Sequence, residues 1–170
     1  MLAVGGKSNS LGKVNEVIDL VLHDPQRLDE LYACLFEEDA WLRMRAADAL
    51  EKVCRQHPDW LLPYIDRFFD ELSTTTQPSI QWHLAQIYRE TSLTSEQKKQ
   101  AANWLKGLLS NKDVDWIVGA NAMDTLVQFT KEGAFPRSQM EDLLKVQQGH
   151  KSNAVIKRAN KFLSELSTNS

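Results

Sequence analysis

Apolar residues between Ala40 and Pro58 recur every three or four positions, which is the spacing of one face of an α-helix. The residues on this face are Leu42, Ala46, Ala49, Leu50 and Val53. Because the alanine side chain is small, Ala46, Ala47 and Ala49 allow a neighbouring helix to approach closely. The stretch therefore predicts a helix that packs inside a stack of helices.

The same pattern returns three times along the chain. The apolar positions 42, 46 and 50 recur after 38 residues, after another 38 and after a further 37. The recurring residues are, in turn, Ile80, Leu84 and Tyr88, then Val118, Ala122 and Leu126, and finally Val155, Ala159 and Leu163. A second apolar segment with helical spacing precedes each copy, and no stretch has the alternation of a strand. We therefore expect an all-α chain of four stacked helical hairpins.

Breaks in the pattern set the expected boundaries. We expect repeats at residues 25–57, 58–91, 94–132 and 137–166, within a single domain that spans residues 11–166. Residues 11–23 predict an additional helix that covers the end of the stack, where a terminal repeat otherwise leaves an apolar face in water. Residues 1–10 and 167–170 lack periodicity and are expected to be tails, the first of them flexible.

Short-range signals mark several helix ends. Thr94 with Gln97, and Ser138 with Glu141, have the spacing of a capping box at a helix start. Gly133 follows the third returning helix and suits a left-handed position at its end.

Charge is uneven along the 170 residues, although the net charge is only −3. Residues 1–75 hold 8 Lys and Arg against 14 Asp and Glu, whereas residues 76–170 hold 12 against 9. The overall balance argues against a nucleic-acid partner, which normally requires concentrated Lys and Arg. One basic segment, residues 145–161, contains no acidic residue and has the charge to contact an acidic partner or RNA. Because no exposed aromatic residue accompanies it to stack a base, we interpret it as cations near the last end of the array.

The cysteines and the hydropathy of the chain indicate where in the cell the protein is expected. Cys34 and Cys54 both lie on expected apolar helix faces, with no spacing typical of a disulfide framework or a zinc site. No apolar run reaches transmembrane length, and residues 1–6 lack the features of a signal peptide. We therefore expect reduced thiols, no membrane association and a cytoplasmic location.

The repeat resembles the HEAT motif, in which an acidic turn precedes an apolar residue with Arg, then a pair of alanines and a later Leu. The first copy carries this pattern as Asp39, Leu42-Arg43, Ala46-Ala47 and Leu50. LLPYI at 61–65 and VIKRANKFL at 155–163 are partial matches, and the 37–38-residue period is close to that of HEAT and armadillo arrays. The resemblance covers roughly residues 25–166 and implies a right-handed α-α superhelix.

The later copies depart from the motif. The Asp position holds Gln77 in the second copy, and the Arg position holds Gln81 and then Gly119. HEAT families often link successive repeats through that Asp and Arg. The sequence therefore leaves open how repeats beyond the first are linked.

The resemblance implies a scaffold that binds a protein or peptide on its concave face, which the second helix of each hairpin lines. Positions just beside the apolar stripe of these helices should form a polar ridge along that face, with Trp82 as an aromatic anchor. The predicted partner-binding residues are Arg45, Asp48, Lys52, Trp82, His83, Gln86, Asn121, Asp124, Arg158 and Lys161.

The sequence contains few candidate catalytic or metal-binding residues. His83 near Asp48 has the residue types of a carboxylate-oriented base, but no nucleophile or oxyanion-hole motif accompanies them. Cys54 and His57 share a helix at i, i+3 spacing without further metal ligands beside them. No glycine-rich phosphate loop is present. We therefore expect no catalytic residues, no metal and no cofactor.

Two alternative functions stay open at this stage. Certain alkylpurine DNA glycosylases have a HEAT-like fold and use tryptophans with an aspartate in a basic groove, an arrangement that Trp82 with Asp48 or Asp124 resembles in part. The second alternative is a structural subunit of a larger complex. Otherwise the chain is expected to be a monomer. A basic groove would favour the first alternative, and a broad apolar outer face the second.

Overall fold

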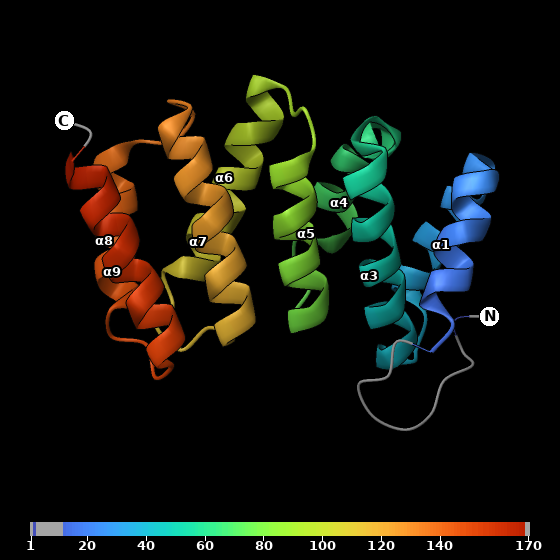
Figure 1. The fold of residues 1–170 in the computed structure, drawn as a ribbon, viewed down its shortest axis with the longest axis horizontal. Helices are drawn as coiled ribbons and strands as arrows, with labels where there is room; N and C mark the ends of the chain where they lie inside the picture. The colour runs from blue at the N-terminus through green and yellow to red at the C-terminus, as the bar shows by residue number, and fades with distance from the viewer. Residues whose placement is uncertain (1, 3–11, 169–170) are drawn as a thin grey trace.

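The computed structural model describes residues 2 and 12–168, and every regular element in these residues is helical. This confirms the expected all-α class. The successive elements lie side by side along one axis (Figure 1). They are α1 (Val14–His23), η1 (Pro25–Arg27), α2 (Leu28–Ala33), η2 (Cys34–Phe36), α3 (Ala40–Gln56), η3 (Pro58–Tyr64), α4 (Ile65–Leu72), α5 (Pro78–Glu90), α6 (Ser95–Leu109), α7 (Trp116–Lys131), α8 (Arg137–Gln147) and α9 (Asn153–Thr168).

The helices form two layers. The second helices of the repeats, α3, α5, α7 and α9, form one row in which each packs against the next (Figure 1). They begin at residues 40, 78, 116 and 153, which reproduces the predicted spacing. The first helices, including α6 and α8, form the layer behind. Helix α1 packs against α3 and so extends the row of second helices at its N-terminal end.

Small residues let the two layers pack closely. The side chains of Ala46, Ala49, Ala122 and Ala159 on the second helices are fully buried. A larger side chain at such a position has to displace a neighbouring helix. This packing is the physical basis of the alanine pattern in the sequence.

Replacing Ala46 with leucine should therefore destabilise the protein. Ala46 has no exposed surface, so added methyl groups would overpack the core and lower the free energy of unfolding by about 1–3 kcal/mol. Urea denaturation measures this change. An unchanged unfolding free energy would show that Ala46 does not face a packed helix.

Proline breaks the first helix of the second repeat into two parts. Pro58 and Pro63 both lie in η3, and the chain becomes α-helical only from Ile65 onward. Because proline has no N–H, neither residue can donate a backbone hydrogen bond to the ladder of an α-helix. The segment therefore takes 3₁₀ geometry, which the periodicity alone does not reveal.

Two of the three helix-end predictions were confirmed and one was wrong. Thr94 and Gln97 form a capping box at the start of α6, and Gly133 has the left-handed conformation expected of it, with φ of 75°. The capping box predicted from Ser138 and Glu141 was wrong. Helix α8 begins at Arg137, after Pro136, which is two residues earlier than a cap at Ser138 requires, and Glu141 instead accepts a hydrogen bond from Arg137 at 2.9 Å.

The structure shows how the first two repeats are linked. Arg43 donates from Nε to Oε1 of Gln77 at 2.7 Å, and from Nη1 to the carbonyl oxygens of Glu37 and Glu38. Gln77 donates in turn from Nε2 to the carbonyl oxygen of Ala40 at 2.9 Å. The glutamine amide thus occupies the position of the family's aspartate and accepts a hydrogen bond from the motif arginine.

Different residues link the third repeat to the fourth. The buried side chain of Gln147 donates from Nε2 to the carbonyl oxygens of Leu109 and Asn111 at 2.8 and 3.1 Å. His150, also buried, donates from Nε2 to the carbonyl oxygen of Val114 at 2.7 Å. These bonds satisfy the carbonyl groups of the α6–α7 turn, where the chain has no Asp–Arg pair.

The ends of the domain differ slightly from the expected boundaries. Helix α9 continues to Thr168, two residues past the expected end of the last repeat. The predicted N-terminal tail, residues 1–10, lies outside the described residues apart from Leu2, which is buried.

Candidate functional site

The exposed side of the row of second helices carries charges of both signs, and we call it the second-helix face. Most of these charges are paired. Lys52 lies 2.8 Å from Asp48 on α3, and Arg55 pairs with Glu51 on the same helix. The accessible charged residues of this face include Asp48, Lys52, Arg55, Arg89, Glu90, Asp124, Arg158 and Lys161, whereas Glu51 is buried beneath Arg55. The surface is therefore polar and mixed in charge.

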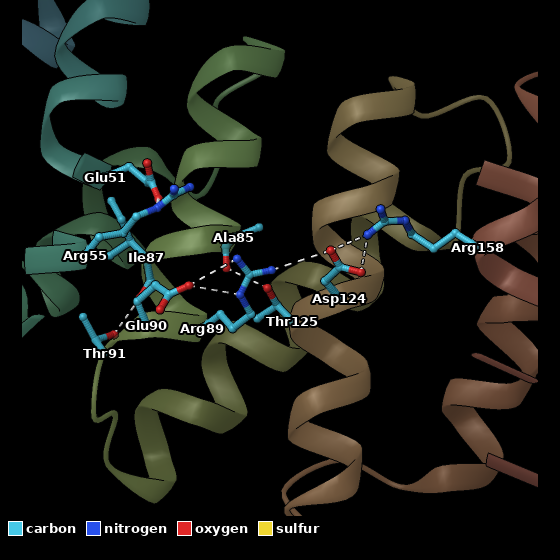
Figure 2. Close-up of polar contacts among 10 residues, drawn as sticks. All are labelled: Glu51, Arg55, Ala85, Ile87, Arg89, Glu90, Thr91, Asp124, Thr125 and Arg158. Atoms are coloured by element: carbon cyan, nitrogen blue, oxygen red, sulfur yellow. Dashed lines mark hydrogen bonds and ion pairs between the residues drawn. The ribbon is translucent and has the colours of Figure 1, made fainter. Parts of the chain in front are cut away.

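A shared carboxylate joins three second helices. Asp124 of α7 lies between Arg89 of α5 and Arg158 of α9 (Figure 2). Its Oδ2 is 3.6 Å from Nη1 of Arg89, and Nη1 of Arg158 donates to both carboxylate oxygens. Arg89 also contacts Glu90, at 3.2 Å. The bridge holds the polar groups of α5, α7 and α9 in a fixed arrangement.

Removing the Asp124 charge should weaken this arrangement slightly. Asp124→Asn leaves two guanidinium groups close together without their shared counter-charge, and we expect a loss of about 0.5–1 kcal/mol of stability because the pairs are partly exposed. Urea denaturation at low salt measures the loss. Asp113→Asn, which breaks only the exposed pair with Lys112, is the control and should be neutral. Equal effects of both substitutions would contradict the bridge.

Two residues of the predicted ridge are not on the surface. Arg45 is 3% exposed and donates from Nη1 to the carbonyl oxygen of Leu2 at 2.8 Å. His83 is 7% exposed and lies beside a small void that Ala47 and Leu50 of the preceding repeat also line. Their expected position on an exposed ridge was wrong, because this side of each second helix faces its neighbour in the stack.

The other predicted residues are at least partly accessible. Trp82 is partly covered, with its ring centroid 5.3 Å from that of His83, and Gln86 is also partly buried. Asn121 donates to the carbonyl oxygen of Ile117 in its own helix. Asp48 and Lys52 form an ion pair, and the last three predicted residues, Asp124, Arg158 and Lys161, lie together at one groove.

These three residues line a groove between α7 and α9, which we call the α7–α9 groove. Its volume is about 310 Å³, and Ala154, Lys157 and Phe162 complete its lining. Lys157 and Phe162 were not among the candidate residues singled out in the sequence. The basic segment at residues 145–161 was the available signal, but it did not show that Asp124 and an aromatic ring lie beside it.

A second, apolar groove lies at the N-terminal end. It has a volume of about 330 Å³ between α1, α2 and α3, and Leu2 and Cys34 are among its lining residues. Burial raises the pKa of the Cys34 thiol, which therefore stays protonated and unreactive at neutral pH. Leu2, itself part of the wall, is already packed against the core.

The candidate chemical groups are in unreactive surroundings. Burial lowers the pKa of His83 to about 4, and its ring lies against the preceding repeat rather than in a cleft. Burial also raises the pKa of Cys54 to about 12, while His57 stacks on Trp60 with ring centroids 4.0 Å apart. Within residues 2 and 12–168, no cluster of His, Cys, Asp and Glu is suited to a metal ion.

Comparison with known proteins identifies the family. The family model described as HEAT repeat domain matches residues 6–100, which is more than half of the chain. Comparisons with curated proteins and with solved structures gave no match. None of the helices in the described part of the chain is long and apolar enough to cross a membrane. From the repeat spacing, the two-layer stack and this match, we conclude that the chain belongs to the HEAT repeat domain family.

Proposed function

We propose that this protein is a non-enzymatic scaffold that holds a segment of a partner protein across its second-helix face. The observation that carries the proposal is the α7–α9 groove, where Lys157, Arg158 and Lys161 surround the partly buried ring of Phe162. A groove with an aromatic residue and charged groups at its rim suits a peptide anchored by one apolar side chain. HEAT arrays commonly present such extended surfaces to partners.

The charge pattern favours a protein partner over a nucleic acid. The accessible carboxylates of Asp48, Glu90 and Asp124 interrupt the cations along the second-helix face. A nucleic-acid backbone carries closely spaced negative charges and would meet these carboxylates repeatedly. The partial burial of Trp82 also argues against a glycosylase-like site, which needs an accessible aromatic platform.

We place the scaffold in the cytoplasm as part of this proposal. Cys34 and Cys54 are both free thiols, as expected of a reducing compartment. The proposal requires no metal or cofactor. The partner is a protein, and the scaffold works either alone or within a larger complex.

A pull-down from native lysate tests the proposal. The tagged wild-type chain is compared with a variant in which Lys52, Arg89 and Lys161 are changed to alanine, which removes one cation from each of α3, α5 and α9. The control changes Lys99, Lys112 and Lys145, which lie outside the second-helix face, and alters the net charge equally. All three proteins are first checked for the same thermal unfolding.

We expect a protein that the wild type and the control retain and the second-helix-face variant loses. If all three tagged chains retain the partner, the interface lies on another surface and the proposal is contradicted. Loss with the control alone would also contradict the proposal.

A further inference from the structure

The turn before α3 presents two aromatic and two acidic side chains to solvent. Phe36 and Trp41 are 47% and 43% exposed, which is unusual for large apolar residues in this protein. Glu37 and Glu38 lie between them, are both exposed, and form no ion pair within the described chain. We call residues 36–41 the acidic turn. Exposed aromatic residues grouped in this way are typical of a binding surface.

Hydrogen bonds from the repeat motif fix the shape of this turn. The Nη1 of Arg43 donates to the carbonyl oxygens of Glu37 at 2.6 Å and Glu38 at 2.9 Å. Asp39 accepts a hydrogen bond from the backbone N–H of Trp41 at 2.8 Å. Because the backbone is already ordered, docking of this turn costs less conformational entropy than docking of a disordered segment.

The α7–α9 groove has complementary chemistry. Lys157 has no carboxylate within ion-pair distance among the residues described, and the side chain of Lys161 is 72% exposed. Glu165, the neighbour of Lys161 at 3.7 Å, is closer to Lys131, at 2.8 Å. The Asp124 carboxylate is already shared by two arginines. The groove therefore has an excess of positive charge beside the ring of Phe162.

The two complementary surfaces cannot meet within one molecule. The acidic turn precedes α3, whereas the groove lies between α7 and α9 near the other end of the array (Figure 1). Helix α5 lies between them in the row. We propose that the acidic turn of one molecule docks into the α7–α9 groove of a second copy, with Glu37 and Glu38 facing Lys157 and Lys161. The proposal uses the groove that the proposed function assigns to a protein partner, and names one occupant.

This contact joins two different surfaces, so it is heterologous. Each molecule in a pair keeps one unused turn and one unused groove, and further copies can add until a ring closes or an open chain forms. The contact area of one turn is small, and its ion pairs are exposed to solvent. The association should therefore be weak and sensitive to salt.

Sedimentation velocity of the purified chain gives the first result. At low salt the average mass should rise with protein concentration above the 19.4 kDa of one chain. In about 1 M salt, where the Debye length falls to ~3 Å, it should return to the mass of one chain. A single-chain mass at every concentration in low salt would overturn the proposal.

Two charge-reversal variants then locate the contact. The groove variant, K157E/K161E, and the turn variant, E37K/E38K, should each associate at least about tenfold more weakly than the wild type, because like charges would face each other. An equimolar mixture should recover association, since the turn of the groove variant still fits the groove of the turn variant. The other contact, between the groove of the groove variant and the turn of the turn variant, has both signs exchanged and is also complementary, so the recovered assembly should alternate the two variants.

The matched control is K99E/K112E, which changes the net charge by the same amount as the groove variant and leaves the groove intact. It should associate more strongly than the groove variant and retain the concentration dependence of the wild type. Equal weakening by the control and the groove variant, or no recovery on mixing, would overturn the proposal. Recovery on mixing also shows that both variants are folded. A negative result with the purified chain leaves the pull-down of another protein unaffected, so this inference and the proposed function fail separately.

Discussion

Replacing Tyr88 with alanine should lower the free energy of unfolding by about 3–5 kcal/mol, the range for removing a large buried aromatic side chain. Tyr88 on α5 is 1% exposed. Its ring centroid lies 5.0 Å from that of Phe69 on α4 and 5.8 Å from that of Trp104 on α6. The ring therefore packs against first helices of two successive repeats, and its removal leaves a cavity where those repeats meet.

Guanidinium denaturation measures the effect of Tyr88→Ala. Trp116→Ala is the control, because the side chain of Trp116 is 51% exposed and its loss should change stability by less than about 0.5 kcal/mol. Similar losses from the two substitutions would contradict the packing of Tyr88 between repeats.

Acidification should destabilise the protein through His83. Burial lowers the pKa of His83 to about 4 from an ordinary value of 6.5, although Asp48 acts in the opposite direction. Between these two values the unfolded chain binds more protons at this residue than the folded chain does, so stability falls as the pH falls. The full contribution between pH 7 and pH 4 is about 3 kcal/mol, at 1.36 kcal/mol for each unit of pKa difference.

The comparison that isolates this effect is with His83→Gln. Both proteins are unfolded in urea at several pH values from 7 to 4.5, and the wild-type stability should fall more steeply than that of the variant. Glu51, whose pKa burial raises, titrates in both proteins and cancels in the difference. If the difference in stability between the two proteins does not change with pH, the pKa of His83 is not lowered in the folded state.

The architecture could be predicted because it depends on a repeated apolar pattern. The positions equivalent to Ala46 recur at Leu84, Ala122 and Ala159, and all four side chains are buried in the structure. A periodic signal of this kind is independent of the details of any one contact. The starts of the second helices therefore followed from the sequence.

The exposure of individual polar residues could not be predicted in the same way. Arg45 and His83 flank the apolar stripe, so their positions are consistent with either solvent or a neighbouring helix. In a stack each inner second helix packs against first helices and against the helices on both sides, which buries residues well beyond a narrow stripe. Only the tertiary arrangement shows that His83 faces the preceding repeat.

The links between repeats and the α7–α9 groove depend on contacts between distant residues. Gln77 substitutes for an aspartate because its amide reaches Arg43, 34 residues earlier. Asp124 and Arg158 are likewise 34 residues apart. Neither pairing leaves a local signal in the sequence, so the groove was visible only as a basic segment without its acidic and aromatic neighbours.

Amide hydrogen exchange with a partner recovered in the pull-down tests the central claim most directly. The chain is labelled alone and in the complex, and the protection of each helix is compared. A partner held on the second-helix face should increase the protection of α5, α7 and α9, most strongly beside the α7–α9 groove. Added protection confined to α6 and α8, in the layer behind, would contradict binding at this face.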